Sequence, residues 1–440
     1  MDVIGLIAAK RDGRELSNKD ISAIIQKIVS GEIPDYQVSA WLMAVYINGM
    51  TFGEIEALTH AMRDSGNRID MSSLPEGISI DKHSTGGVGD KTSLVVAPLL
   101  AAAGVPILKM SGRGLGFSGG TIDKLESIPG FRVELTPEEA LEQTRSIGLA
   151  ILAQSAQLAP ADKILYSLRD VTGTVDSIPL IASSIMCKKL AGGASRILLD
   201  VKVGRGAFMH TLKRARELAK ILIKIGNRAG TPTLALLTDM DTPLGRSVGN
   251  ALEVKEAIML LNNDPQSDSR FRSLCLSLTA HGLVAAGKCS TLQSGRSLAQ
   301  RLLSSGSGSA KFVEWIEAQG GPPGMINILS SLPVSFQTFQ VYSPVSGYLN
   351  DIDPGLVGEL AVNMGAGRAV KGQSIDHSTG IYMHLVIGDS VIREQPLATL
   401  FLSARDSART EEFAAAYLSA CQISSIPQQH RRRPVFSALK

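Results

Sequence analysis

The sequence predicts an α/β protein with a mostly parallel sheet, a small all-helical domain and a C-terminal β-rich subdomain. Three observations support this fold class. Residues 1–66 carry apolar side chains at helical spacing. From residue 78, short β-rich runs closed by glycine or proline alternate with helical patterns, which is typical of α/β layering. Beyond residue 339 the pattern becomes all-β.

The first 66 residues predict helices with recognisable ends. Ser17 is a suitable N-cap for "NKDISAIIQKIVSG", Pro34 opens "DYQVSAWLMAVYINGM", and Thr51 caps "FGEIEALTHAMRDSG". Gly31 and Gly66 are the expected stops.

Five apolar runs predict the strands of the central sheet: "ISID", "VPILKM", "LAILA", "RILLDVKVG" and "TLALLTDM". Between the third and fourth runs, "APADKILYSLRDVTGTVDSIPLIASSIMCKKLAGG" reads as helices that could lie against the N-terminal ones. The helical domain would then be discontinuous. The expected division is a helical domain of residues 1–66 and 161–193, an α/β phosphate-binding domain of residues 78–156 and 195–335, and a C-terminal subdomain of residues 340–440.

The C-terminal segment has the pattern of a lipoyl-like β-sandwich, with Gly347, Gly380 and Gly388 at turns. A carrier domain of this kind needs a modifiable lysine at a hairpin tip. The corresponding region offers His384 and no lysine, so we expect a sandwich that packs on the main domain and has no carrier role.

Composition excludes several function classes. The 44 basic and 41 acidic side chains give a formal charge of +3, a near balance that predicts no nucleic-acid partner. No apolar run reaches membrane-spanning length free of charge, so no membrane partner is expected. The four cysteines are far apart and form no CxxC pair, which favours neither a disulfide framework nor a zinc site. We expect a cytoplasmic enzyme or binding protein.

Two glycine-rich loops resemble known phosphate-binding motifs without fitting them. In "DKHSTGGVGDKTSL" (residues 81–94), Asp90 separates Gly89 from Lys91, whereas a nucleoside-triphosphate loop needs glycine directly before that lysine. "GLGFSG" (residues 114–119) matches GxGxxG, but Pro129 halts the following segment before a dinucleotide-binding helix could form.

Together the two loops predict a site for one compact oxyanion. Each loop follows a predicted strand and precedes a helix, so both lie at the carboxyl edge of the sheet, where backbone amides and helix N-termini bind anions. For a single hydroxyl such as that of Ser93, a helix-capping role is the simpler alternative. The side chains expected to hold the phosphate are those of Lys82, Ser84, Ser93, Ser111 and Thr121.

These loops, with "LAPADKILYSLRDVTGTVDSIPLIASSIMCKKLA" and "DVKVGRGAFM", closely resemble the thymidine and pyrimidine-nucleoside phosphorylase family over essentially the whole chain. The resemblance implies a homodimer whose helical and α/β domains close over phosphate and a pyrimidine nucleoside. The family also resembles the anthranilate phosphoribosyltransferases, which bind a diphosphate through metal. The single-phosphate ligand set argues against that second function.

The resemblance assigns the phosphate ligands to the five residues already named. It implies that His83, Arg169 and Lys188 act in catalysis and, with Ser184, recognise the base. Ser184 and Lys188 are four residues apart and therefore share one helical face. For Arg169, the alternative is a salt bridge with a neighbouring aspartate. Relatives bind potassium near the glycine loop, and the positions that match theirs are Gly89, Lys91, Leu244, Ser247 and Glu256.

One departure from the family pattern is Phe117-Ser118, where many relatives have His-Thr. A second position bears on specificity. Lys109-Met110 stands where thymidine-restricted relatives have Met-Ile, and a lysine there could reach the phosphate or the pentose.

The implied reaction is reversible phosphorolysis of uridine and thymidine or deoxyuridine to free base and (deoxy)ribose 1-phosphate, with phosphate as co-substrate and no required cofactor. A thymidine-restricted phosphorylase and a non-catalytic nucleoside or phosphate sensor are the alternatives.

Overall fold

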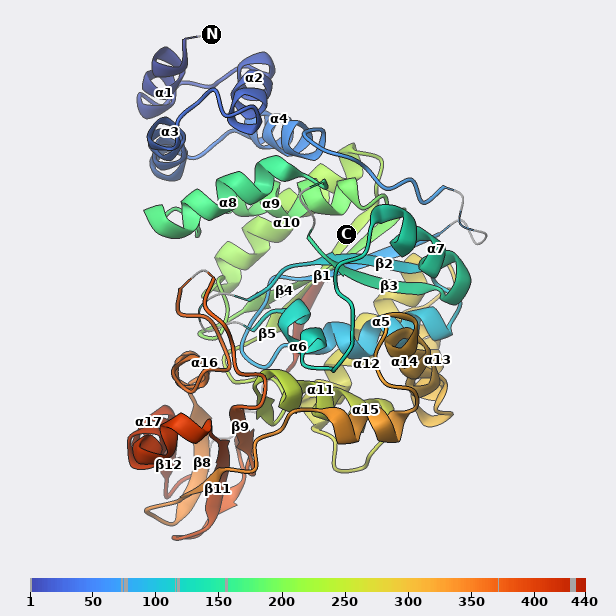
Figure 1. Ribbon diagram of the computed structural model, residues 1–440, viewed down its shortest axis with the longest axis vertical. Coiled ribbons are helices and arrows are strands. Elements are labelled where there is room, and N and C mark those ends of the chain that lie inside the picture. The colour runs from blue at the N-terminus through green and yellow to red at the C-terminus, as the bar shows by residue number, and fades with distance from the viewer. Residues whose placement is uncertain are drawn as a thin grey trace.

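The structure is a computed structural model that describes residues 2–72, 74, 78–114, 116, 119–154, 157–370, 372–427 and 433–440. A helical layer lies at one end, an α/β body in the middle and a β-rich region at the other end (Figure 1). The predicted fold class is confirmed.

The helical layer combines two segments that are far apart in the sequence. Helices α8 and α9 pack against the N-terminal helices, and Leu165 and Cys187 share a buried cluster with Ile21 (Figure 1). The predicted N-caps are observed: the Asp20 amide donates to Ser17 Oγ at 3.2 Å, and Thr51 forms a capping box. The helices are α1 (Val3–Arg11), α2 (Asn18–Val29), α3 (Asp35–Asn48), α4 (Phe52–Arg63), α8 (Pro160–Thr172) and α9 (Ile178–Ala191).

The central sheet has the strand order β1-β4-β5-β13, in which the first three strands are parallel. Strands β2 and β3 form a separate parallel pair that lies beside β1. All five predicted strands are present. They are β1 (Ile80–Ser84), β2 (Ile107–Ser111), β3 (Leu149–Ala153), β4 (Arg196–Val203) and β5 (Thr233–Asp239).

Helices cover both faces of this sheet because the side chains of its buried strands alternate between two apolar clusters. Leu198 of β4 packs with α5 and α12, whereas the next residue, Leu199, packs with α9 and α10. The remaining elements of the body are α5 (Thr92–Ala102), α6 (Thr121–Glu126), α7 (Pro137–Ile147), α10 (Leu212–Arg228), β6 (Ser247–Val248), α11 (Asn250–Leu261), α12 (Ser269–Ala285), α13 (Leu292–Ser304), α14 (Ser307–Ala318) and α15 (Met325–Ser331).

The C-terminal region is rich in strands, as predicted, but it is not all-β. Its two sheets have the orders β10-β8-β12 and β6-β9-β11-β7, and two helices pack with them. Its elements are β7 (Thr338–Tyr342), β8 (Gly347–Ile352), α16 (Pro354–Asn363), β9 (Gly380–Met383), β10 (Ser390–Val391), β11 (Pro396–Phe401), the 3₁₀ helix η1 (Ala404–Arg409), α17 (Thr410–Ala420), β12 (Cys421–Ser424) and β13 (Val435–Leu439).

The last strand leaves this region and returns to the body. Strand β13 pairs antiparallel with β5, so it covers the edge of the central sheet. In the opposite direction, β6 of the body pairs with β9 and joins a C-terminal sheet. The body and the C-terminal region therefore exchange strands. Among the described residues, no helix is both long enough and apolar enough to cross a bilayer.

Candidate functional site

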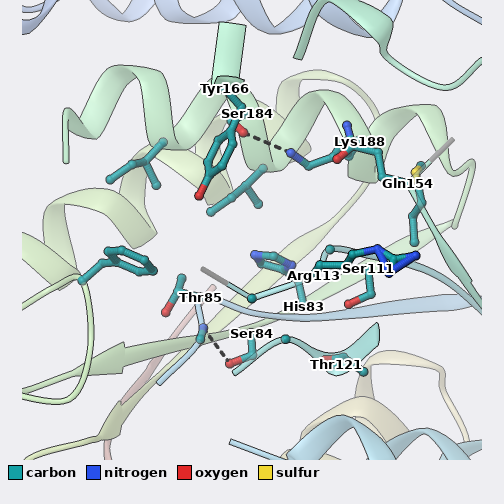
Figure 2. A pocket seen from close by; sticks show the side chains of 18 of the residues that line it. His83, Ser84, Thr85, Ser111, Arg113, Thr121, Gln154, Tyr166, Ser184 and Lys188 are labelled. Carbon is teal, nitrogen blue, oxygen red and sulfur yellow. Dashed lines mark hydrogen bonds between the residues drawn. The ribbon is translucent and has the colours of Figure 1, made fainter. Parts of the chain in front are cut away.

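A cavity of 380 Å³ lies between the carboxyl edge of the sheet and helices α8 and α9. Figure 2 shows Tyr166, Ser184 and Lys188 on the helices, facing His83 and Ser111 across the cavity. Eight of the predicted site residues line it: His83, Ser84, Lys109, Ser111, Thr121, Arg169, Ser184 and Lys188.

The sheet side of the cavity is formed by the ends of two strands and the start of a helix. Ser84 and Ser111 are the last residues of β1 and β2, and Thr121 is the first residue of α6. Gly120, the preceding residue, allows the loop to fold tightly, since a Cβ there would lie 2.2 Å from the Gly114 amide nitrogen. Three hydroxyl-bearing residues thus converge near a helix N-terminus.

Lys109 adds a buried positive charge to this side. The residue is 2% exposed, and its ammonium group has no hydrogen bond or ion pair to any residue within the described ranges. Burial, reinforced by the nearby ammonium of Lys189, lowers the pKa of Lys109 to about 7. Lys189 is satisfied instead, because it donates to Asp81 Oδ2 at 2.7 Å and to the Met110 carbonyl at 3.0 Å. An unpartnered buried cation on a cavity wall is suited to bind an anion.

Lys82 and Ser93 do not line the cavity. Lys82 is fully buried, and its Nζ lies 2.6 Å from Thr92 Oγ1, 3.3 Å from Ser93 Oγ and 3.4 Å from Asp200 Oδ2. Both side chains therefore lie behind the cavity wall, where they support the loop that carries Ser84.

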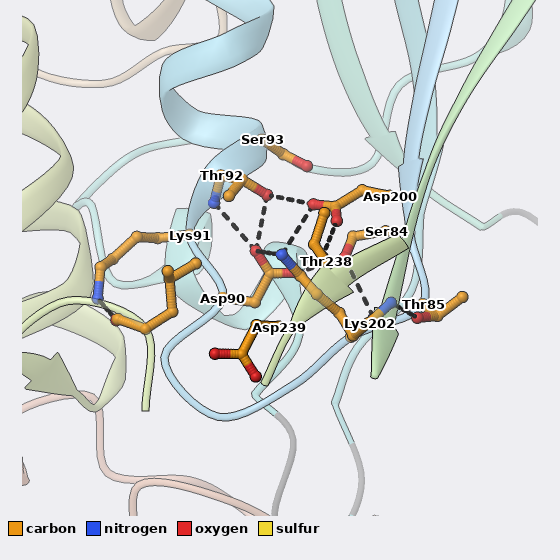
Figure 3. A network of polar contacts seen from close by, with 12 residues as sticks. Ser84, Thr85, Asp90, Lys91, Thr92, Ser93, Asp200, Lys202, Thr238 and Asp239 are labelled. Atoms are coloured by element: carbon orange, nitrogen blue, oxygen red, sulfur yellow. Dashed lines mark hydrogen bonds and ion pairs between the residues drawn. The ribbon is translucent and has the colours of Figure 1, made fainter. Parts of the chain in front are cut away.

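A buried polar network holds that loop in shape (Figure 3). Ser84 Oγ donates to Asp90, and Asp90 accepts from Thr92 Oγ1 at 2.7 Å. Lys202 lies 2.9 Å from Asp200 and 3.8 Å from Asp90. Burial opposes ionisation of Asp90, but the positive charges of Lys202 and Lys82 keep the pKa of this carboxyl low. Asp90 is therefore an anion that fixes the Ser84 hydroxyl.

The helix side of the cavity carries a second cation. Ser184 and Lys188 share one face of α9, as their four-residue spacing predicted. Lys188 Nζ donates to Ser184 Oγ at 3.0 Å and forms an ion pair with Asp162. Burial alone would lower the pKa of Lys188, but Asp162 raises it above the ordinary lysine value. Lys188 is charged at neutral pH.

Arg169 makes no salt bridge with Asp170 or Asp176, two residues that the structure describes. Its three side-chain nitrogens donate instead to the carbonyls of Thr174 at 3.3 Å, Leu180 at 3.2 Å and Val175 at 2.6 Å. A guanidinium has five N–H donors, so two remain for a ligand in the cavity.

His83 lies between the two sides of the cavity. Burial, together with Lys189, Lys109 and Lys188, lowers its pKa well below the ordinary histidine value. The imidazole is therefore neutral at pH 7 and offers one N–H donor and one acceptor.

The cavity residues that the sequence reasoning missed include Asp162, Tyr166 and Gln154. The Gln154 amide donates to Asp162 Oδ2 at 3.2 Å. Asp162, Tyr166 and Arg169 follow one another at spacings of four and three along α8, so they share the face that meets the cavity. This row of polar side chains along one face of α8 was the sequence pattern that could have indicated their place in the site.

The five positions matched to a potassium site come together near the first glycine loop. Lys91 enters this group through its side chain, which contacts Leu244, Ser247 and Glu256. The Phe117-Ser118 departure lies outside the described residues.

The fold and the two-sided cavity define an α/β glycosyl transferase with a helical domain. Residues 76–309 match the α/β domain of the glycosyl transferase family and residues 4–66 its helical bundle domain. Residues 348–424 match the pyrimidine nucleoside phosphorylase C-terminal domain.

Similar curated proteins identify the family more closely. The chain is 48% identical to a pyrimidine-nucleoside phosphorylase of Geobacillus stearothermophilus and 47% identical to one of Bacillus subtilis. Each match covers 91% of this chain and 92% of the relative. The chain belongs to the pyrimidine-nucleoside phosphorylase family.

A solved structure shares the fold at lower similarity. The anthranilate phosphoribosyltransferase from Thermus thermophilus superposes with a TM-score of 0.58 at 20% identity. The match covers 72% of this chain and 99% of that one. Because only 20% of the aligned residues are identical, the match shows a shared fold alone.

Proposed function

We propose that the protein catalyses the reversible phosphorolysis of pyrimidine nucleosides to free base and (deoxy)ribose 1-phosphate. The observation that carries this proposal is the two-sided cavity. One side is lined by the Lys109 ammonium, which has no partner among the described residues, and by three hydroxyl-bearing residues; a charged lysine and an arginine line the other side. This arrangement suits two substrates with different needs.

The phosphate binds on the sheet side. Lys109 supplies the positive charge, and the hydroxyls of Ser111 and Thr121 donate to the phosphate oxygens. Ser84 lines the same side, but its single O–H is donated to Asp90, so it shapes the loop beside the phosphate. Lys82 and Ser93 were expected as direct ligands. Their hydrogen bond to each other behind the wall supports a role in holding the loop.

In the reaction a phosphate oxygen bonds to C1′ of the pentose as the bond from C1′ to the base nitrogen breaks. The bonding electron pair leaves with the base, so negative charge develops on the pyrimidine while positive charge develops on the sugar. The phosphate dianion stabilises the sugar carbon, and the helix side stabilises the leaving base. No nucleophile from the protein is required.

The leaving base is recognised by His83, Arg169, Ser184 and Lys188. Lys188 and the free N–H groups of Arg169 donate to a base carbonyl and the ring nitrogen, where the charge develops. The neutral imidazole of His83 donates to the second carbonyl. Closure of the helical and α/β domains over both substrates excludes water, which would otherwise hydrolyse the same bond.

We also propose that both uridine and thymidine or deoxyuridine are substrates. The ammonium of Lys109 is available on the cavity wall, and a donor there can bond to the 2′-hydroxyl of a ribose, a contact that methionine cannot make. A thymidine-restricted enzyme is the alternative. The ratio of kcat/KM for uridine and thymidine, measured in the wild type and in Lys109→Met, separates the two.

The test of the reaction is the ultraviolet absorbance of uridine and thymidine incubated with the protein, with and without phosphate. An enzyme changes the absorbance only when phosphate is present. A sensor binds the nucleoside saturably in both cases and releases no base.

A homodimer is proposed from the outer face of the helical layer. Ile4 of α1 is 69% exposed, and Tyr36 and Ile47 of α3 are 73% and 71% exposed. Tyr36 and Ile47 lie about three helical turns apart and therefore share one face of α3. Large exposed apolar side chains favour contact with a second copy. Light scattering should give twice the chain mass, and Ile47→Glu should give the monomer.

The proposed location is the cytoplasm. All four cysteines are free, and two of them are buried, which is typical of proteins from a reducing compartment. Fractionation of cells should place the activity with the cytoplasmic marker enzymes.

A further inference from the structure

The side chain of Lys91 ends in a buried cage of oxygen atoms. The residue is 1% exposed, and Nζ donates to the Leu244 carbonyl at 2.7 Å and the Ser247 carbonyl at 3.0 Å. Its third partner is Glu256 Oε2, at 2.7 Å. An ammonium has three N–H donors, so three acceptors satisfy it completely. In Figure 3 this side chain points away from the network around Asp90 and Asp200.

The cage is built for a cation. The Glu256 carboxylate also accepts the backbone amides of Arg246 at 2.7 Å and Ser247 at 2.8 Å, which fixes its position. Gly89 has φ +75°, and a Cβ there would lie 2.7 Å from the Leu244 carbonyl oxygen. Glycine thus lets the loop approach the cage oxygens closely.

These are the positions that resemble a potassium site, yet the residues present do not fit a potassium ion. The Lys91 ammonium already takes up the two carbonyls and the carboxylate. Among the described residues, the carboxylate that contacts the Lys91 ammonium is that of Glu256. A second cation beside this ammonium would share that carboxylate, and a buried charge without a partner of its own is costly.

We propose that the Lys91 ammonium replaces the monovalent cation, so that this protein is independent of potassium. The cage connects three parts of the body: the first glycine loop, the segment from Leu244 to Ser247 at the start of β6, and helix α11. Strand β6 in turn pairs with β9 of the C-terminal region. A cation bonded covalently to the chain holds these parts together at any salt composition.

The test compares melting temperatures in potassium chloride and choline chloride at equal ionic strength, about 100 mM, so that general screening is the same. Three proteins are measured: the wild type, Lys91→Ser and Lys10→Ser. Lys10 is a matched control because it is also buried and paired with a buried carboxylate, that of Glu54 at 2.9 Å, outside the cage.

We expect the same melting temperature for the wild type in both salts. Lys91→Ser should melt several degrees lower in choline and regain most of the loss as potassium rises, with saturation. Lys10→Ser should melt lower to the same extent in both salts. Phosphorolysis rates should follow the same pattern as a second readout.

Two results would overturn the proposal. One is a saturable rise of the wild-type melting temperature with potassium, because the cage would then admit an ion beside Lys91. The other is a Lys91→Ser protein whose melting temperature falls by the same amount in potassium chloride and in choline chloride. If Lys91→Ser does not fold in either salt, the wild-type comparison decides alone.

Discussion

The buried ammonium of Lys109 should destabilise the free protein, although it binds the phosphate. Its removal should therefore raise stability and lower activity. In Lys109→Met a buried ammonium without a partner among the described residues is replaced by an apolar side chain of similar length. The fall of the pKa from 10.5 to about 7 means that the charged form costs about 5 kcal/mol at pH 6, on the scale of 1.36 kcal/mol per pKa unit.

The sign of the pH dependence follows from this shift. Between about pH 7 and 10.5 the unfolded chain binds a proton at Lys109 that the folded chain lacks, so wild-type stability rises with pH in that window. The stabilisation gained by Lys109→Met should therefore shrink from about 5 kcal/mol at pH 6 to about 2 kcal/mol at pH 9. Chemical denaturation at both pH values measures this difference, and the KM for phosphate should rise in the variant.

Lys189→Met is the matched control. Lys189 is equally buried and lies close enough to affect the pKa of Lys109, but it is paired with Asp81. Its removal leaves that carboxylate buried and unpaired, a loss of about 3–5 kcal/mol. The reasoning is refuted if Lys109→Met is less stable than the wild type at pH 6, or if its KM for phosphate is unchanged.

Three further predictions concern other parts of the structure. Asp162→Asn removes the carboxylate that raises the pKa of Lys188, so the alkaline limb of the kcat/KM profile should move to lower pH, whereas an unmoved limb would show that Lys188 does not titrate there. Arg169→Ala should lower kcat by roughly 10²–10³, the usual effect of losing a transition-state donor, and Arg169→Lys should not recover it, because lysine lacks the planar fork that meets three carbonyls. Recovery by lysine in steady-state assays would mean that charge alone matters. Deletion of residues 434–440 exposes the edge of β5, so aggregation on warming should increase by light scattering, and unchanged scattering would argue against an edge-covering role.

The sequence predicted the features that depend on local pattern. The strands and the N-caps at Ser17 and Thr51 follow from spacing and capping chemistry, and all are present. The two glycine loops were placed at the carboxyl edge of a parallel sheet, and the predicted ligands Ser84, Ser111 and Thr121 do line one cavity with Lys188.

Features that depend on pairing across long separations were not predicted. Strand β13 lies about two hundred residues from its partner β5, and no local pattern encodes that pairing. The same holds for Lys91, whose partners lie more than 150 residues away. For Arg169, the alternative of a salt bridge with a neighbouring aspartate is not observed among the described residues, because the guanidinium donates to the carbonyls of Thr174, Val175 and Leu180.

The helices α16 and α17 were missed for a different reason. Helix α16 contains two glycines, and strand patterns flank both helices. The apolar residues of α16 pack into the cluster of the C-terminal sheets, so tertiary contact decides the conformation.

The central claim is that phosphate attacks C1′ of a pyrimidine nucleoside in the cavity between the sheet edge and α8 and α9. The most direct measurement is phosphorus NMR of uridine incubated with the protein and ¹⁸O-labelled phosphate. The account predicts a new resonance of ribose 1-phosphate that keeps the full isotope shift, formed in step with free uracil. Free uracil without a pentose phosphate would indicate hydrolysis, and unchanged spectra at saturating nucleoside would contradict the claim.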